Sequence, residues 1–158
     1  MQPRRREDPK NRTKASFVPS NLRGCVYLAM VLTSTVVRSQ EPSGKSVWQG
    51  VYSAAQSERG AAVYKQSCGT CHGETLAGDI GPTLTGPFWS IWEGRSAGDL
   101  LKTIRTTMPA DAPESLKAQE YADVVAYLFS VNKFPAGEKE LPVDEAALGS
   151  IKIVKQAP

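Results

Sequence analysis

Three residues within five positions could do chemistry together, because the segment Cys68-Gly69-Thr70-Cys71-His72 holds two thiols and an imidazole. Two cysteines at this spacing can form thioethers with the two vinyl groups along one edge of a porphyrin, and the next residue is then carried under the ring. The pattern Cys-x-x-Cys-His is typical of c-type haem attachment. We therefore expect one haem c, covalently bound through Cys68 and Cys71, with His72 as an axial ligand of the iron.

Two other kinds of site use similar residues. A thioredoxin-like dithiol also has Cys-x-x-Cys, but it expects the motif after a strand in a βαβ unit, and no such pattern flanks this segment. A zinc site normally needs four protein ligands. The chain has no second histidine, and its third cysteine, Cys25, lies in an expected leader. The spacing therefore favours haem over a dithiol or zinc.

The first 39 residues of this 158-residue chain differ in composition from the rest. A basic segment precedes an apolar run over 26–37, which is typical of a secretory signal and too short to span a bilayer comfortably. We expect a signal peptide over 1–39, with a long basic n-region, and hence an exported, periplasmic protein. The alternative is an uncleaved leader that acts as a membrane anchor, and only then would a membrane be a partner.

The formal net charge of +3 is a property of this leader. Residues 1–39 hold eight basic and two acidic side chains, so the remainder holds 11 Lys and Arg against 14 Asp and Glu, a net charge of −3. A chain with this excess of acidic residues lacks the basic surface that nucleic-acid binding requires. We therefore expect no nucleic-acid partner.

Helices are the elements that would position the haem motif. After a polar segment over 40–50, expected to be a linker, Ser53 and Gln56 match the capping box that starts a helix. Small and apolar residues at 60, 63, 64 and 67 continue one helical face into the motif. The same spacing at 121, 124, 125 and 128 indicates a second helix, and Ser96 with Asp99 indicates the start of a third. With negligible strand content, the predicted fold class is all-α.

Gly60 costs about 1 kcal/mol relative to alanine inside a helix, which the close approach of another helix would explain. In this respect the chain resembles the class I c-type cytochromes. They have Gly-x-x-x-aromatic (Gly60 and Tyr64 here) before Cys-x-x-Cys-His, and Ala-Tyr-Leu (126–128 here) in their C-terminal helix. The resemblance covers about residues 47–133. It implies a cytochrome c-like fold with three main helices and loops around one haem, in which the first and last helices cross at the glycine.

The resemblance is closest to monohaem domains found beside or fused to quinoprotein dehydrogenases. The shared segments include Thr106-Thr107-Met108-Pro109-Ala110 and Phe134-Pro135-Ala136-Gly137. We accordingly expect a cytochrome c domain over 51–134 and a C-terminal tail over 135–158 that packs on it.

The loop after the haem motif contains Gly81-Pro82-Thr83-Leu84, which is similar to the Gly-Pro-x-Leu of the same family. The resemblance implies that Pro82 and Leu84 border the haem. In particular, the Pro82 carbonyl would accept a hydrogen bond from the second nitrogen of the axial histidine, which fixes the ring orientation and raises ligand basicity. The alternative is that Pro82 only shapes a turn.

Met108 is the expected second axial ligand. A low-spin electron-transfer haem needs a sixth ligand, and the single histidine is already used. Of the three methionines, Met1 and Met30 lie in the leader, whereas Met108 lies in a segment stiffened by Pro109 and Pro113. In the family that the chain resembles, a Met followed by Pro is the usual distal ligand. The alternative role for a lone methionine is to fill the core.

An aromatic cluster at 88–92 is expected to be core that includes one face of the porphyrin. A buried tryptophan N–H requires a hydrogen-bond partner. We expect Trp92 to donate to a haem propionate and Arg95 to supply a charge partner for the same group.

Two functions follow from these expectations. The first is an electron-transfer protein, not an enzyme, in which His72 and Met108 close both axial positions of the iron. Its partners would be a dehydrogenase donor, such as a quinoprotein, and a cytochrome or oxidase acceptor. The alternative is a haem enzyme or sensor in which Met108 dissociates and the iron binds a small ligand.

Overall fold

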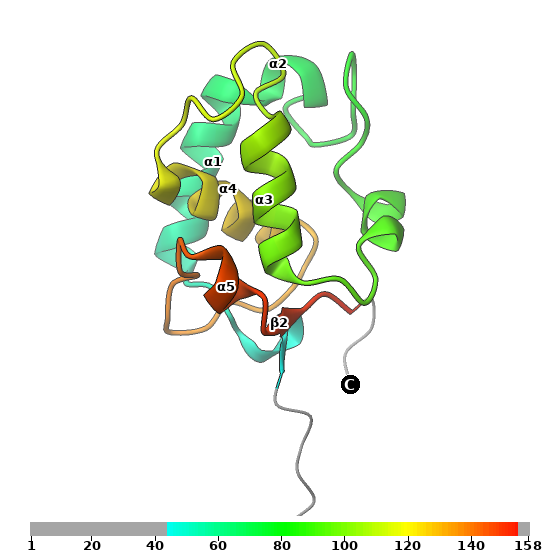
Figure 1. Cartoon of the computed structure of the whole chain (residues 1–158). Coiled ribbons are helices and arrows are strands. Elements are labelled where there is room, and N and C mark those ends of the chain that lie inside the picture. Colours follow the sequence, from blue (N-terminus) through cyan, green and yellow to red (C-terminus); the bar gives the residue numbers. More distant parts are fainter. Residues whose placement is uncertain (1–43, 155–158) are drawn as a thin grey trace, which may run out of the picture. The chain divides into compact units, whose positions relative to one another are not determined.

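The computed structural model describes residues 44–154. The predicted signal peptide, Cys25, the start of the expected linker and the last four residues lie outside this range. The described elements are β1 (Lys45–Ser46), a 3-10 helix (Val47–Gln49), α1 (Ala54–Ser67), α2 (Gly69–His72), a second 3-10 helix (Gly86–Ile91), α3 (Ala97–Thr107), α4 (Ala118–Val131), α5 (Glu145–Leu148) and β2 (Ile151–Lys152) (Figure 1). Over 44–154, no helix is both long enough and apolar enough to cross a bilayer.

Ser53 caps helix α1: its hydroxyl accepts a hydrogen bond from the Gln56 main-chain N–H at 3.1 Å. The second half of the expected capping box is absent. The Gln56 side chain, which is fully buried, instead accepts from the N–H of Leu141 at 2.7 Å and donates to its carbonyl at 3.1 Å. The amide of Gln56 thus satisfies both polar main-chain groups of a buried residue 85 positions away.

Helices α1 and α4 cross at Gly60, as expected. A methyl group on residue 60 would overlap the carbonyl oxygen of Asp123 and lie 2.9 Å from Cβ of Tyr127. Beside the crossing, Arg59 donates to both carboxylate oxygens of Asp123, at 2.9 and 3.1 Å, and to Glu140 at 2.9 Å. The absence of a side chain at Gly60 allows the two backbones to meet.

Helix α3 begins with a complete capping box, as Ser96 and Asp99 indicated. The Ser96 hydroxyl accepts from the Asp99 N–H at 3.0 Å, and the Asp99 carboxylate accepts from the Ser96 N–H at 3.0 Å and its hydroxyl at 2.7 Å. These hydrogen bonds from Ser96 hold the pKa of Asp99 below its ordinary value.

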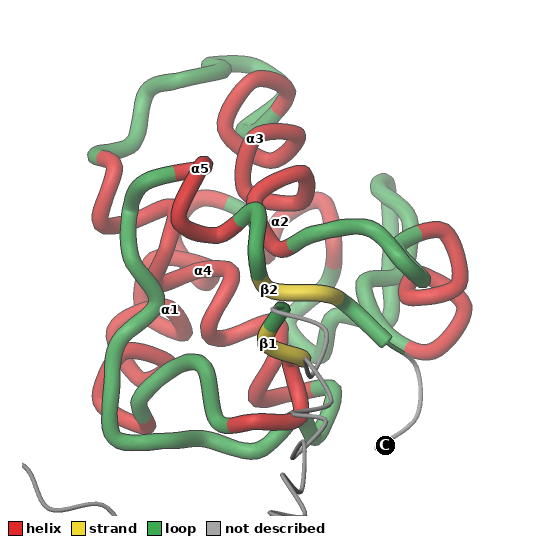
Figure 2. Tube along the Cα trace, turned by 60° about the horizontal axis from the view of Figure 1, so that its bottom comes forward, coloured by secondary structure: helices red, strands yellow, loops and turns green. Residues whose placement is uncertain are grey.

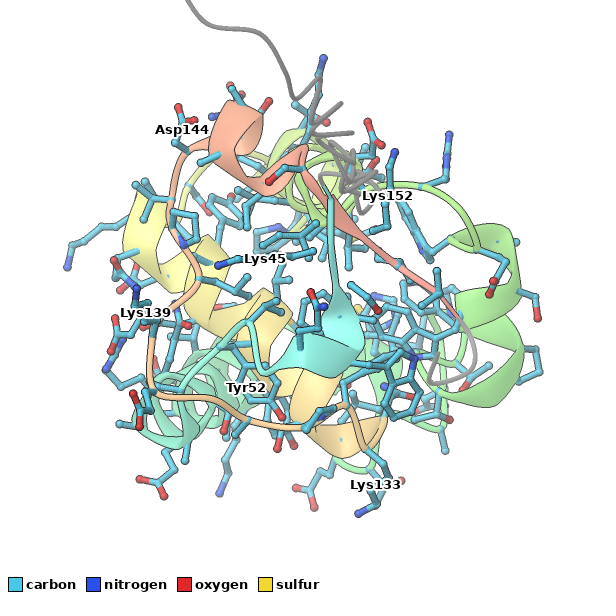
Figure 3. All side chains as sticks on the ribbon, turned by 90° about the horizontal axis from the view of Figure 1, so that it is seen from below. Lys45, Tyr52, Lys133, Lys139, Asp144 and Lys152 are labelled. Atoms are coloured by element: carbon cyan, nitrogen blue, oxygen red, sulfur yellow. The ribbon has the colours of Figure 1, made fainter. Side chains whose placement is uncertain are left out.

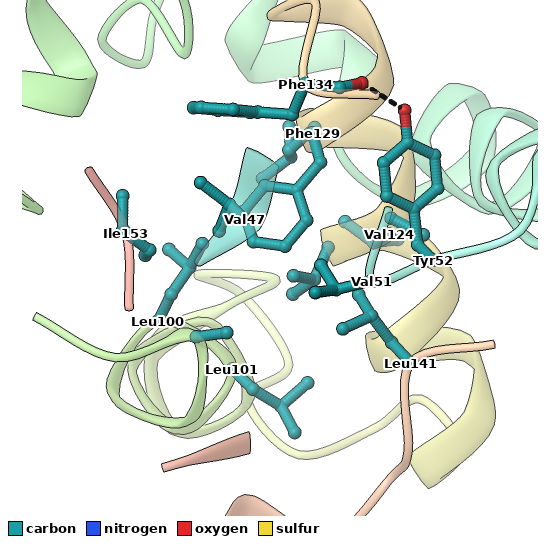
Figure 4. Packing of buried hydrophobic residues seen from close by; sticks show 14 of the residues in the cluster. Val47, Val51, Tyr52, Leu100, Leu101, Val124, Phe129, Phe134, Leu141 and Ile153 are labelled. Atoms are coloured by element: carbon teal, nitrogen blue, oxygen red, sulfur yellow. Dashed lines mark hydrogen bonds between the residues drawn. The ribbon is translucent and has the colours of Figure 1, made fainter. Parts of the chain in front are cut away.

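Residues 135–154, here called the C-terminal strap, pack across the helices and bury four apolar side chains: Leu141, Leu148, Ile151 and Ile153. The strap leaves α4 where the Tyr52 hydroxyl donates to the Phe134 carbonyl at 2.7 Å (Figure 4). Figure 3, which shows the molecule from below, shows the strap passing Lys139 and Asp144 before it reaches Lys152. Its β2 pairs in parallel with β1, with Ile151 opposite Lys45 (Figure 2).

The described part of the expected linker is structured. Val47 is fully buried, and the ring of Trp48 lies edge-on to that of Phe134, with centroids 4.9 Å apart. The Trp48 indole N–H donates to the Val154 carbonyl at 2.9 Å. Two apolar side chains therefore hold this segment against the helices and the strap.

We expect Gly60→Ala to lower the free energy of unfolding of the haem-loaded protein by roughly 3 kcal/mol, because overpacking at a backbone contact outweighs the gain of about 1 kcal/mol in helix propensity. Denaturant unfolding followed by circular dichroism measures this change. Glu58→Ala, on the exposed face of the same helix, is the control and should stay within about 0.5 kcal/mol of wild type. Equal stability of the two variants would contradict the close crossing.

The lowered pKa of Asp99 predicts a pH-dependent contribution to stability. A carboxyl group whose folded pKa is depressed stabilises the fold above its unfolded pKa, and this contribution disappears as the pH falls through the folded pKa. Asp99 is exposed, so we expect Asp99→Asn to cost less than about 1 kcal/mol at pH 7. Unfolding curves of wild type and variant, compared between pH 7 and pH 2, should converge at the acidic end; a constant difference would refute the capping role.

Candidate haem site

A cavity of about 780 Å³ lies between α2 with the loop that follows it, α3 and α4. Much of its wall is apolar and comes from Phe88, Leu100, Ile104, Val124 and Leu128. Seven of the eight predicted site residues line this cavity: Cys68, Cys71, His72, Pro82, Leu84, Trp92 and Met108. Arg95 does not line it. Helix α3 ends, at Thr107, on the same side of the molecule as α2, so residues 40 positions apart in sequence meet here.

His72 lies at the C-terminal end of α2 and is 7% exposed. Its Nδ1 lies 2.8 Å from the carbonyl oxygen of Pro82, in position to donate a hydrogen bond, and this is the contact that the family resemblance implies. The loop is held close by main-chain hydrogen bonds from Gly81 to Cys71, at 2.7 Å, and from Gly78 to His72, at 2.9 Å. A methyl group on residue 81 would lie 3.0 Å from both Cε1 and Nδ1 of the imidazole. The ring orientation is therefore fixed by the loop, and Nε2 is left without a hydrogen bond to the protein among the described residues.

Cys68 and Cys71 are free thiols at the start and end of the same turn. Burial raises the pKa of the Cys68 thiol to about 11, with a smaller contribution from Cys71. Redox-active dithiols need the opposite, a lowered pKa that favours the thiolate. The surroundings of Cys68 thus disfavour the dithiol alternative and fit a sulfur that faces an apolar wall.

Tyr64, which the sequence placed on a helix face and in the Gly-x-x-x-aromatic pattern, borders the same wall. Its hydroxyl donates to the Gly73 carbonyl at 2.8 Å, directly after the motif. Burial raises the pKa of Tyr64 to about 12, and the neighbouring Cys68 and Tyr127 add to the shift, so the phenol stays a neutral donor. A buried tyrosine hydroxyl requires a hydrogen-bond partner. A tyrosine on the buried face of the helix before the motif is therefore the sequence feature that could have identified this contact.

Met108 follows the last residue of α3 and is half-buried. Its N–H donates to the Ile104 carbonyl at 2.8 Å, and this is the last hydrogen bond of the helix. Its carbonyl accepts from the Tyr121 hydroxyl of α4 at 3.0 Å. Tyr121, which the sequence placed on the apolar face of a helix, therefore holds the main chain of the predicted ligand.

Trp92 is 4% exposed, and its indole N–H has no hydrogen-bond partner among residues 44–154. A buried donor without a protein partner at the wall of a cavity requires an acceptor there. Arg95 stacks on the ring of Trp92, with Cζ 5.0 Å from the centroid, rather than facing the cavity. The Leu84 carbonyl accepts from the Asn132 side chain at 3.1 Å, which ties this wall to the end of α4.

The residues of the cavity fit a haem. Two thiols and an imidazole lie on one side, a thioether belongs to the same lining, the walls are apolar, and a buried N–H is free to meet a carboxylate. Residues 55–128, from α1 to most of α4, match the family model described as cytochrome C oxidase, cbb3-type, subunit III. These residues form a class I c-type cytochrome domain. No curated protein and no solved structure matches the chain significantly.

The match over residues 55–128 supports an electron-transfer haem protein, because a cytochrome c domain implies haem c as its cofactor and redox proteins as its partners. The all-α, cytochrome c-like fold is confirmed by the same match and by the helices of the structure. In the cytochrome domain the first and last helices cross at Gly60, as the resemblance implied.

We expect Gly81→Ala to push the imidazole away from the Pro82 carbonyl by a few tenths of an ångström. A weaker hydrogen bond would make His72, the predicted axial ligand, a poorer donor to the iron. The reduction potential of the haem-loaded protein should then rise by roughly 20–60 mV, from a hydrogen bond of about 0.5–1.5 kcal/mol and 59 mV per factor of ten. Spectroelectrochemical titration measures the shift. Thr75→Ala, an uncharged and exposed position in the same loop, is the control; equal potentials in both variants would show that this contact does not tune the histidine.

Proposed function

We propose that this chain is a periplasmic monohaem cytochrome c that shuttles single electrons and is not an enzyme. The observation that carries the proposal is that the cavity is lined by His72 from one wall and Met108 from another. Haem c, when bound, supplies the one-electron redox chemistry, and the protein supplies attachment, orientation and a docking surface.

The roles of the residues follow from their positions. Cys68 and Cys71 would form the two thioethers, and His72, oriented by the Pro82 carbonyl, would be one axial ligand. Met108, held by the end of α3 and by Tyr121, would be the other. With His72 and Met108 both bound to the iron, no coordination site would be open to a substrate, and the thioether ligand would raise the reduction potential. Outer-sphere electron transfer is the chemistry that remains.

The Trp92 indole N–H would donate to a propionate, because it lacks a partner in the cavity wall. Arg95 stacks on that indole, so its positive charge would attract the propionate across the ring without a direct contact.

The proposed partners are a dehydrogenase donor and a cytochrome or oxidase acceptor. The segments shared with quinoprotein-associated domains support the donor, and the description of the matched family, which names an oxidase subunit, supports the acceptor. Ile80 lines the cavity and is 81% exposed, so it offers an apolar contact at the margin of the site. Export by a signal peptide over 1–39 is supported by the basic and apolar segments of the leader.

The spectrum of the purified protein tests the axial ligands. The oxidised wild type should show the weak sulfur-to-iron band near the red end, unaffected by CO or peroxide. Met108→Ala should abolish this band and lower the potential by roughly 0.1 V or more, within the range of about 0.8 V that axial ligands control. Thr106→Ala, on the exposed surface of α3, should leave both unchanged.

Two results would overturn the proposal. A protein purified from an exporting host without covalently bound porphyrin would remove its basis. A Met108→Ala variant with the spectrum and potential of wild type would instead favour the enzyme or sensor alternative, in which the sixth position is open.

A further inference from the structure

Helix α3 faces the cavity on one side and the C-terminal strap on the other. Its cavity-facing residues are Leu100, Thr103, Ile104 and Thr107. Gly98 and Arg105, seven positions and hence about two turns apart, instead contact α5 of the strap, which lies against α3 (Figure 1). The position of α3 relative to the cavity is thus set from both sides.

At the start of α3, the main chain of α5 lies directly on Gly98. A methyl group there would overlap the Glu145 carbonyl oxygen and lie 3.1 Å from the Gly149 nitrogen and 3.3 Å from the Leu148 carbonyl carbon. Leu148 is fully buried beside this contact. The first turn of α3 therefore cannot approach or rotate past α5 without a clash.

At the end of α3, Arg105 joins three segments. Its Nη2 lies 2.7 Å from Oε1 of Glu145 in α5, an ion pair whose geometry is not that of a hydrogen bond. Its Nε lies 4.0 Å from Oε1 of Glu114, and its carbonyl accepts from the Glu114 N–H at 3.0 Å. Residues 105 and 114 thereby close the segment that carries Met108.

We propose that Arg105, held by Glu145 of the strap, is a positioning residue for Met108. The inference rests on the proposed role of Met108 as an axial ligand. Met108 follows α3 directly, so any movement of the last turn moves the thioether. The strap restrains that turn from behind through Arg105, while Tyr121 restrains the Met108 carbonyl from α4. Without the ion pair, the thioether should leave the iron more readily.

This role is tested by the rate at which added imidazole replaces Met108 in the oxidised holoprotein. Loss of the sulfur-to-iron band reports that rate. The variants are Arg105→Gln, Glu145→Gln and the double variant. Because the pair is partly exposed, each single variant should exchange roughly two- to five-fold faster than wild type. The double variant should be no faster than Arg105→Gln, which already removes the contact with Glu145. Lys102→Gln, an exposed cation on the same helix, is the matched control and should exchange at the wild-type rate.

A general loss of stability would lower the unfolding midpoint without changing exchange in the folded protein, so both are measured. Exchange rates equal to those of Lys102→Gln, or additive effects in the double variant, would overturn the positioning role. If Arg105→Gln fails to fold, Glu145→Gln decides, because it leaves Arg105 and its Glu114 contact in place. If wild type lacks the sulfur-to-iron band, the role of Met108 as an axial ligand is wrong. If the band is present but the Arg105 and Glu145 variants exchange at the wild-type rate, only the positioning role of Arg105 is wrong.

Discussion

The contact between the backbones of α1 and α4 at Gly60 places both walls of the haem cavity. Helix α1 runs directly into Cys68 and α2. Its contact with α4 therefore fixes the position of α2, and with it that of His72, relative to α4. Helix α4 contributes Val124 and Leu128 to the opposite wall, and its Tyr121 holds the Met108 carbonyl. The missing side chain at Gly60 therefore sets the position of the Cys68–His72 turn relative to Tyr121, which supports the predicted ligand Met108.

Short-range features of the fold were predictable from the sequence. Capping residues act three positions away, and helical faces repeat every three or four residues, so the starts at Ser53 and Ser96 and the apolar face of α4 could be predicted. The partners of buried polar side chains could not. Gln56 was assigned to a cap because glutamine suits that position, but its amide satisfies the main chain of Leu141, which no local pattern reveals.

The same distinction holds at the site. The residues of the Cys-x-x-Cys-His motif and Met108 carry their chemistry in their side chains, so residue type and spacing were enough to propose them. Tyr64 and Tyr121 act by donating to carbonyl groups of Gly73 and Met108, and a carbonyl group leaves no trace in residue identity. Arg95 was predicted as a charge partner for the haem propionate, but its guanidinium stacks on the Trp92 ring and its carbonyl accepts from the Ile153 N–H, contacts that no local pattern reveals.

The parallel pair of β1 and β2 has a consequence for how such a domain can be joined to others. Lys45 and Lys152, near the two ends of the described chain, belong to neighbouring strands on the side remote from α2. The described chain therefore enters and leaves the domain on that side. A tether joined on that side would leave the side that carries α2 open to redox proteins.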